Sequence, residues 1–296
     1  MTTMSATNKP MQAPRVFNQS RYRKRQWRNQ IGLGFAIFAM GFGLFWLGWI
    51  LWTLISHGIT GLIEMPIFTQ DTPPPMSAGG LKNAIVGSIM ISGAGLFIGA
   101  PIGLLAGIYL AEFSANSRLA KVIRFLNDIL LSAPSIVIGL FVYALMVKNA
   151  SFSGWAGAVA LALIVIPVVV RTTENMLLLI PNALREAAFA LGTPKWKLVL
   201  QVTMKAARAG LLTGILLAFA RITGETAPLL FTALNNQYFS LDMGQAMGNL
   251  PNTIYQFAMS PYYNWHALAW SAALLITLSV LVLNLLARYI GTKDLH

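Results

Sequence analysis

The sequence predicts an all-α polytopic membrane protein with six transmembrane helices. Of its 296 residues, 56% are hydrophobic and 10% are charged, whereas a soluble domain carries about 25% charged residues. The apolar residues form long runs that are nearly free of charge, and each run can cross the roughly 30 Å hydrocarbon core of a bilayer as a helix. Cysteine is absent, which excludes disulfides, thiol nucleophiles and thiolate metal sites.

The chain is expected to begin with a basic cytoplasmic tail, residues 1–30, followed by the first span. The span at 31–55 carries no charge, and at 1.5 Å per residue it reaches roughly 37 Å, enough to cross the bilayer with some tilt. Residues 56–82 contain several prolines and glycines and few charges, as is typical of an external loop. Residues 31–82 therefore predict one helix and one external loop.

The other five spans are expected within residues 83–290, the predicted transmembrane core. They are residues 83–110, 129–147, 154–170, 209–234 and 267–290. The second span has glycine at every fourth position, which leaves bare backbone on one face for close packing of a neighbouring helix. These glycines are Gly95, Gly99, Gly103 and Gly107. Prolines at positions 101, 134, 167 and 228 are expected to bend their spans.

Lysine and arginine are unevenly distributed between the predicted loops. They precede the first span, surround the polar stretch after the fourth span, and accompany a predicted amphipathic helix at 112–128, whereas the other loops hold few. Membrane proteins keep such residues on the cytoplasmic side. This rule explains the net charge of +12 without a nucleic-acid partner. Six spans also place both termini, including residues 291–296, in the cytoplasm.

A polar stretch at 174–205 predicts two short helices joined by a tight turn, which we call the elbow. Pro181 and Pro194 suit the first positions of the two helices. Gly192 can adopt the left-handed conformation that ends a helix. Small side chains at the turn would let another protein approach the backbone, and a glutamate adds one fixed charge. The residues expected at this exposed turn are Glu186, Ala187, Ala188 and Gly192.

Charged residues in or beside the spans are the candidates for chemistry, because a charge at the bilayer centre costs about 2.5–3.5 kcal/mol on insertion scales. Arg221 and Glu225 are four residues apart, so they would share one helical face. They form either a self-neutralising pair or a site where Arg221 attracts an anion that Glu225 gates or orients. Arg171 and Glu174 are either an interface anchor and a helix-start carboxylate or part of the same path.

Several functions conflict with the sequence. The nucleotide-binding pattern Gly-x-x-x-x-Gly-Lys-Ser/Thr does not occur, so the chain is not expected to bind or hydrolyse ATP itself or to need a cofactor. The three histidines are far apart in the sequence, which argues against a metal site. An intramembrane enzyme would need a nucleophile and base within its spans. An ion-coupled secondary transporter would need internal repeats, and it would leave the elbow unexplained.

Four sequence blocks resemble the permease subunits of ABC importers, and among these the phosphate-import permeases. The blocks are residues 127–139, 171–175, 186–195 and 224–231, in that order. The tripeptide at Glu186, followed by Gly192, is similar to the EAA loop of this family, although residues 202–205 depart from its usual Ile-x-Leu-Pro ending. The resemblance covers most of residues 17–291.

The resemblance implies the type I importer permease fold and ATP-driven import of inorganic phosphate across a bacterial cytoplasmic (inner) membrane. It implies that the elbow docks on an ATPase subunit, and it favours a place for the four charged residues along the substrate path. The implied complex contains a second homologous permease subunit, two ATPase subunits that bind the ATP, and an extracytoplasmic phosphate-binding protein. Another oxyanion, such as sulfate, molybdate or tungstate, remains an alternative substrate.

Overall fold

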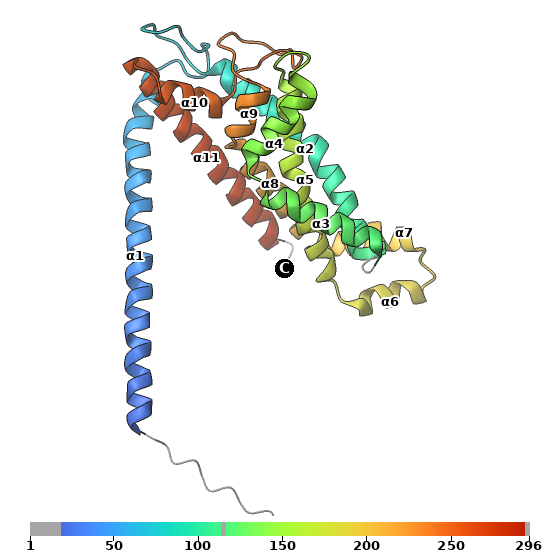
Figure 1. Cartoon of the computed structure of the whole chain (residues 1–296). Coiled ribbons are helices and arrows are strands. Elements are labelled where there is room, and N and C mark those ends of the chain that lie inside the picture. Colours follow the sequence, from blue (N-terminus) through green and yellow to red (C-terminus); the bar gives the residue numbers. More distant parts are fainter. Residues whose placement is uncertain (1–18, 114–116, 294–296) are drawn as a thin grey trace, which may run out of the picture. The chain divides into compact units, whose positions relative to one another are not determined.

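The computed structural model describes residues 19–113 and 117–293, which form helices joined by loops (Figure 1). The chain divides into two units, Met1–Thr53 and Leu54–His296. In the first unit the described residues belong to α1 (Gln19–Glu64), whose apolar window is fully exposed. The predicted boundary between the basic tail and the first helix, after residue 30, is wrong, because α1 already begins at Gln19. Residues 19–30 contain no proline or glycine, so the helix of the first span extends back through them.

The second unit holds the end of α1 and all later elements. Its long helices are α2 (Lys82–Ile108), continued by a π-helical turn η1 (Tyr109–Phe113), α5 (Gly154–Leu178), α8 (Met204–Thr223) and α11 (Tyr263–Lys293). Its shorter elements are α3 (Arg118–Ser132), α4 (Ser135–Val142), η2 (Tyr143–Val147), α6 (Asn182–Ala190), α7 (Lys195–Leu198), η3 (Val199–Thr203), α9 (Ala227–Thr232) and α10 (Leu250–Ala258).

Five helical segments of the described chain are long and apolar enough to cross a membrane, and the bent pair of α3 and α4 with η2 makes a sixth if it counts as one span. The predicted all-helical, multi-span class is confirmed. The third predicted span, 129–147, starts in the last turn of α3, and α3 meets the segment of α4 and η2 at 105°, so the bend predicted at Pro134 is a sharp break. Pro134 causes the break, because proline lacks the N–H and its ring clashes with the carbonyl four residues earlier.

The fifth predicted span, 209–234, is also interrupted. Helix α8 ends at Thr223, and a new helix, α9, begins at Ala227 with Pro228 in its first turn. A continuous helix would place the ring of Pro228 against the carbonyl of Gly224. By contrast, Pro101 and Pro167 lie inside α2 and α5 without ending them. Two of the four predicted bends are therefore complete breaks.

The core of the second unit is the contact between α2 and α5. Four of the glycines of α2 lie directly on α5, and a Cβ added to each would come within 3 Å of side-chain carbons there. The contacts are Gly95 with Leu161 at 2.9 Å, Gly99 with Val165 at 2.9 Å, Gly103 with Val169 at 2.7 Å and Gly107 with Thr173 at 2.6 Å. Residue numbers increase in the same direction along both helices, so α2 and α5 run parallel. The predicted glycine contact face is confirmed.

Replacing Gly103 with leucine should therefore destabilise the fold. The new Cβ would lie 3.0 Å from the Ile166 carbonyl oxygen as well as close to Val169, and overpacking of this kind costs about 1–3 kcal/mol. Gly93 of the same helix has open space where a Cβ would stand, so Gly93→Leu is the matched control. Thermal unfolding in detergent should show a lower midpoint for Gly103→Leu only, and equal midpoints would contradict the packing argument.

Helix α8 runs antiparallel to α5. A Cβ on Gly210 would meet Met176, and one on Gly214 would meet Thr172. Residue numbers therefore increase along α8 in the direction in which they decrease along α5. Within the second unit, α6 and α7 lie at one end of the long helices, and the loops at 65–81 and 233–249 lie at the other (Figure 1). We call these the elbow end and the loop end.

Candidate functional site

The elbow consists of α6, a turn at Gly192, and α7. Gly192 has φ +75°, which confirms the predicted left-handed turn. Pro181 and Pro194 occupy the residue before each helix, not the first helical position as predicted. The second short helix is the start of a continuous helical segment that runs to Thr223, because no proline or glycine follows before Gly210.

Three of the four residues predicted at the docking turn are exposed, namely Glu186, Ala187 and Gly192. The prediction for Ala188 is wrong, because this residue is buried against Leu198 and Val199. Helix α6 folds back on the start of α7 and η3, and its inward face needs a side chain small enough for close contact. Ala188 therefore holds the elbow together and does not present a surface.

Large apolar side chains surround the exposed turn. Phe189 is 50% exposed, Leu191 86% and Trp196 60%. We define the elbow surface as these three residues with Glu186, Ala187 and Gly192. The turn chemistry predicted only the small residues and not the aromatic and leucine side chains beside them.

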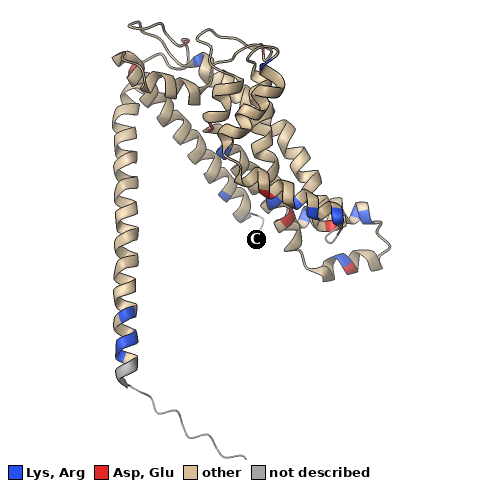
Figure 2. Ribbon diagram, in the orientation of Figure 1, with Lys and Arg blue, Asp and Glu red and all other residues tan. Residues whose placement is uncertain are grey.

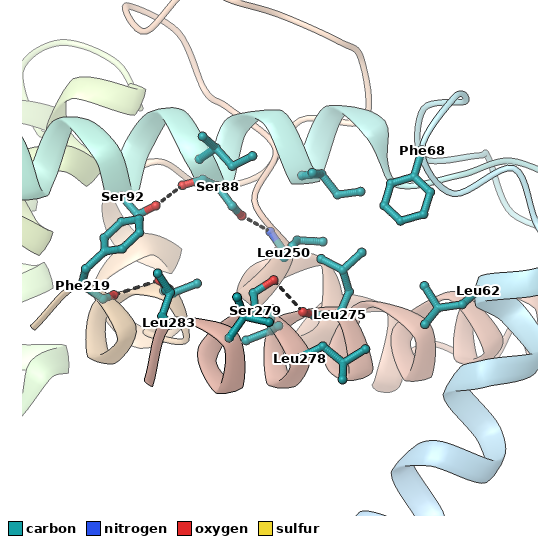
Figure 3. A pocket seen from close by; sticks show the side chains of 15 residues that line it. Leu62, Phe68, Ser88, Ser92, Phe219, Leu250, Leu275, Leu278, Ser279 and Leu283 are labelled. Carbon is teal, nitrogen blue, oxygen red and sulfur yellow. Dashed lines mark hydrogen bonds between the residues drawn. The ribbon is translucent and has the colours of Figure 1, made fainter. Parts of the chain in front are cut away.

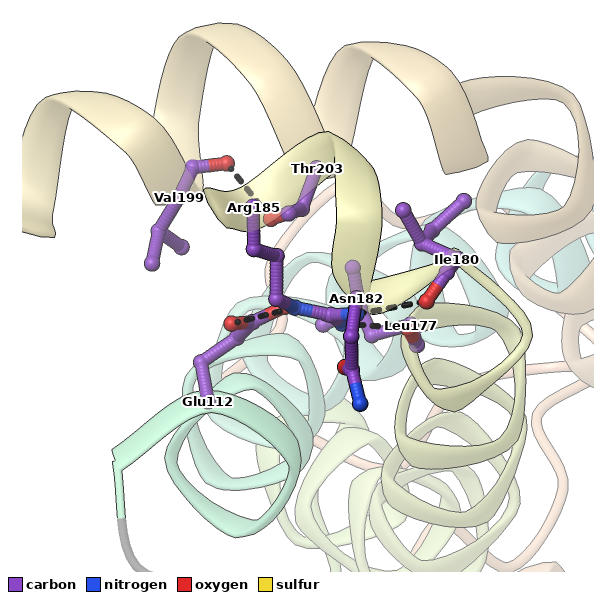
Figure 4. A network of polar contacts seen from close by, with 7 residues as sticks. All are labelled: Glu112, Leu177, Ile180, Asn182, Arg185, Val199 and Thr203. Carbon is purple, nitrogen blue, oxygen red and sulfur yellow. Dashed lines mark hydrogen bonds and ion pairs between the residues drawn. The ribbon is translucent and has the colours of Figure 1, made fainter. Parts of the chain in front are cut away.

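Arg185 attaches the elbow to the ends of two long helices (Figure 4). Its Nη2 lies 2.8 Å from Glu112 Oε1 in η1, and the same Nη2 donates to the Leu177 carbonyl of α5 at 2.8 Å. Its Nη1 donates to the Ile180 carbonyl. The sequence analysis missed this contact, because Glu112 is distant in the chain and only the fold brings the two side chains together.

Glu174 lies in an ion pair with Arg124 of α3, with Nε and Oε1 2.8 Å apart. Its side chain is 6% exposed. The alternative interpretation of Glu174 as a helix-start carboxylate is wrong, since α5 continues to Leu178. The neighbouring Arg171 is exposed. The structure therefore assigns different surroundings to these two candidates.

Arg221 and Glu225 approach each other more loosely, with Nε and Oε1 3.9 Å apart. They do not share a helical face, because α8 ends at Thr223 and Glu225 lies in the break before α9. The Arg221 side chain is 52% exposed and that of Glu225 19%. At 1.5 Å per residue, Arg221 lies about 24 Å along α8 from Lys205, a distance within the thickness of the hydrocarbon core.

The two candidate arginines lie at different depths. Thr172, next to Arg171, is level with Gly214 of α8. Arg221 is seven residues beyond Gly214, which places it about 10 Å closer to the loop end. The two guanidinium groups of Arg171 and Arg221 are therefore separate candidate sites. Both are exposed on the surface of this single chain.

A cavity of about 730 Å³ lies between α2 and α11 (Figure 3). None of the residues that line it is charged. Its hydroxyls are engaged with backbone groups: Ser92 and Ser279 donate to the carbonyls of Ser88 and Leu275, and Ser88 accepts from the Leu250 N–H. This cavity offers no cation to an anion, so the charged candidates lie elsewhere.

Comparison with known proteins identifies the family. The model of the family described as binding-protein-dependent transport system inner membrane component matches residues 99–293. A phosphate transport system permease protein PstA of Yersinia pestis is 57% identical over 94% of this chain and 96% of that protein. The chain belongs to the PstA family of these permeases. A PstA of Haemophilus influenzae is 58% identical over 90% of this chain and 95% of its own length.

Solved structures support the same fold for this PstA-family chain. A bacterial ABC transporter for the acidic polysaccharide alginate has a TM-score of 0.64 at 13% identity, over 92% of this chain and 99% of that one. The MetNI methionine ABC transporter in an inward-facing conformation has a TM-score of 0.59 at 22% identity, over 71% of this chain and 94% of that one. The predicted type I importer permease fold is confirmed.

Proposed function

We propose that this PstA-family chain is the permease subunit that carries inorganic phosphate through an ATP-driven importer. The relatives that match nearly the whole chain are phosphate transport permeases by name. The structural observation that carries the proposal is Arg221, which is half exposed in the last turn of α8, within a helical segment long and apolar enough to cross a membrane. An arginine there is costly against lipid, so it faces a wet path or another subunit.

A second, homologous permease subunit would complete this path. Arg171 and Arg221 lie on the surface of one chain, and a partner packed over them would enclose both. An anion could then move from Arg221 to Arg171, about 10 Å nearer the elbow end. Glu225 would compete for Arg221, which would keep the anion from being held too tightly to leave, whereas Glu174 would act beside the path through its ion pair with Arg124.

The elbow surface would dock on one of two ATPase subunits that supply the ATP site. The permease itself lacks the nucleotide-binding pattern, so it would have no ATPase activity of its own. Closure of the two ATPase subunits would move the elbow, and the long helices would tilt to open the path alternately to each side. The extracytoplasmic phosphate-binding protein would deliver the anion at the loop end.

The basic residues support an orientation with the elbow end in the cytoplasm. In the second unit, lysine and arginine gather on α3, on α7 and at the start of α8, at the elbow end (Figure 2). The positive-inside rule assigns such a cluster to the cytoplasm. With six crossings, both termini of the chain would also be cytoplasmic.

Competition between anions tests the substrate. A reconstituted complex with its ATPase and binding protein should take up labelled phosphate only when ATP is supplied. Excess arsenate, which shares the shape and charge of phosphate, should suppress most of this uptake, whereas excess sulfate or molybdate should not. Equal suppression by sulfate would favour the alternative oxyanion substrate, and uptake without ATP would favour a secondary transporter.

A further inference from the structure

Both helices of the elbow contact the end of α2. From α6, Arg185 pairs with Glu112 at 2.8 Å. From α7, the Lys195 Nζ lies 4.8 Å from the centre of the Phe113 ring, a cation–π distance. Glu112 and Phe113 are adjacent in η1. The last turn of α2 is therefore held from two sides by the segment that carries the elbow surface.

Arg185 also holds α5. The last carbonyls of a helix have no partner within that helix, and the negative end of the helix dipole favours a cation there. The guanidinium donates to the carbonyl of Leu177 in the last turn of α5 and to that of Ile180, two residues beyond the helix. Its planar set of five N–H donors allows these bonds and the ion pair at once. One side chain thus joins α2, α5 and α6.

This joint is shielded from water. The side chains of Arg185 and Glu112 are 16% and 4% exposed, so solvent weakens their attraction much less than at a surface. Glu112 lies in a π-helical turn, a feature that often occurs at functional sites. The glycine contacts between α2 and α5 continue down to Gly107 and Thr173. A force applied at Arg185 therefore acts on two helices that are already packed together.

We propose that the Arg185–Glu112 pair is the joint through which movement of the elbow reaches α2 and α5. The proposal rests on the proposed function, because it concerns how ATP hydrolysis by the docked subunits is coupled to transport. Arg185 and Glu112 act here as positioning residues, because neither of them touches the anion. Glu112 is also not part of the elbow surface. Loss of the pair should disconnect hydrolysis from uptake while the elbow surface stays complete.

Glu112→Gln tests this in the reconstituted complex, because glutamine has the size of glutamate without its charge. We expect normal retention of the ATPase subunit and continued ATP hydrolysis, with phosphate uptake per ATP reduced about tenfold. Glu112→Asp keeps the charge on a shorter side chain, and should give an intermediate ratio. Lys121→Gln is the matched control: it removes one exposed charge from α3 and should leave the ratio unchanged.

Spin-label distances give a second readout on the cysteine-free chain. Labels at Ala183 of α6 and Leu105 of α2, both exposed, should keep one narrow distance when ATP binds, because the elbow and α2 move together. In Glu112→Gln the distance should broaden or shift with ATP. A normal uptake ratio in Glu112→Gln, or parallel loss of ATPase binding and uptake, would overturn the proposal.

The two proposals fail in different ways. If the complex hydrolyses ATP but transports an anion other than phosphate, the substrate is wrong, and the uptake ratio for that anion tests the joint in the same way. If the label distance changes with ATP in the unaltered chain, the elbow and α2 do not move as one body, and the joint is wrong whatever the substrate.

Discussion

Arg221→Gln should abolish phosphate uptake by the assembled complex. The Arg221 side chain is 52% exposed in the last turn of α8, and its contact with Glu225 is long at 3.9 Å, so much of its charge is available to a passing anion. A charge-assisted contact contributes about 1.5–3 kcal/mol, and losing it should reduce uptake by about a hundredfold at the upper end of that range.

Two further variants distinguish the effect of the Arg221 charge from an effect on the structure of the complex. Arg221→Lys keeps the charge but not the planar fork, and should retain part of the uptake. Lys148→Gln removes an exposed charge from the turn after η2 and should transport normally. Uptake of labelled phosphate and recovery of the intact complex are measured together. Unchanged uptake in Arg221→Gln would remove this residue from the path, and failure to assemble would make its role structural.

Gly192→Val should abolish binding of the ATPase subunit while membrane insertion stays normal. Gly192 has φ +75°, and a non-glycine residue in the left-handed region costs roughly 1–2 kcal/mol. Valine is branched at Cβ and is especially unfavourable there. An added Cβ would meet nothing within 4 Å in this chain, so the change would act through the turn. A reshaped turn would separate Glu186, Ala187 and Phe189 of α6 from Trp196 of α7.

Gly192→Asn is the control, because asparagine is bulkier than alanine yet accepts the left-handed conformation. Copurification of the ATPase subunit should survive in Gly192→Asn and disappear in Gly192→Val, with equal amounts of each permease in the membrane. Binding by the valine variant would show that the turn is not required for docking. Loss in both variants would mean that the partner needs bare backbone at Gly192 more than it needs the turn.

The elements that depend on local chemistry were predictable from the sequence. Long charge-free runs can only be buried in a bilayer or a core, so the spans followed from composition and length. The glycines of α2 and the turn at Gly192 were predictable because a missing side chain has a direct steric consequence. The prolines were identified as well, but not their outcome: Pro134 and Pro228 break their spans, whereas Pro101 and Pro167 remain inside helices.

What only the tertiary structure decided is which distant residues meet. Glu112 and Arg185 are separated by a whole hairpin of helices, and so are Arg124 and Glu174; neither pair has a local signal, because the attraction between charges depends on distance in space. The sequence does not distinguish Ala188 from Ala187, but in the fold α6 packs on η3 and buries Ala188. The sequence by itself determined a membrane-spanning permease with an elbow, through hydrophobicity, steric limits and family resemblance. The fold decided how that elbow is fastened to the helices it would move.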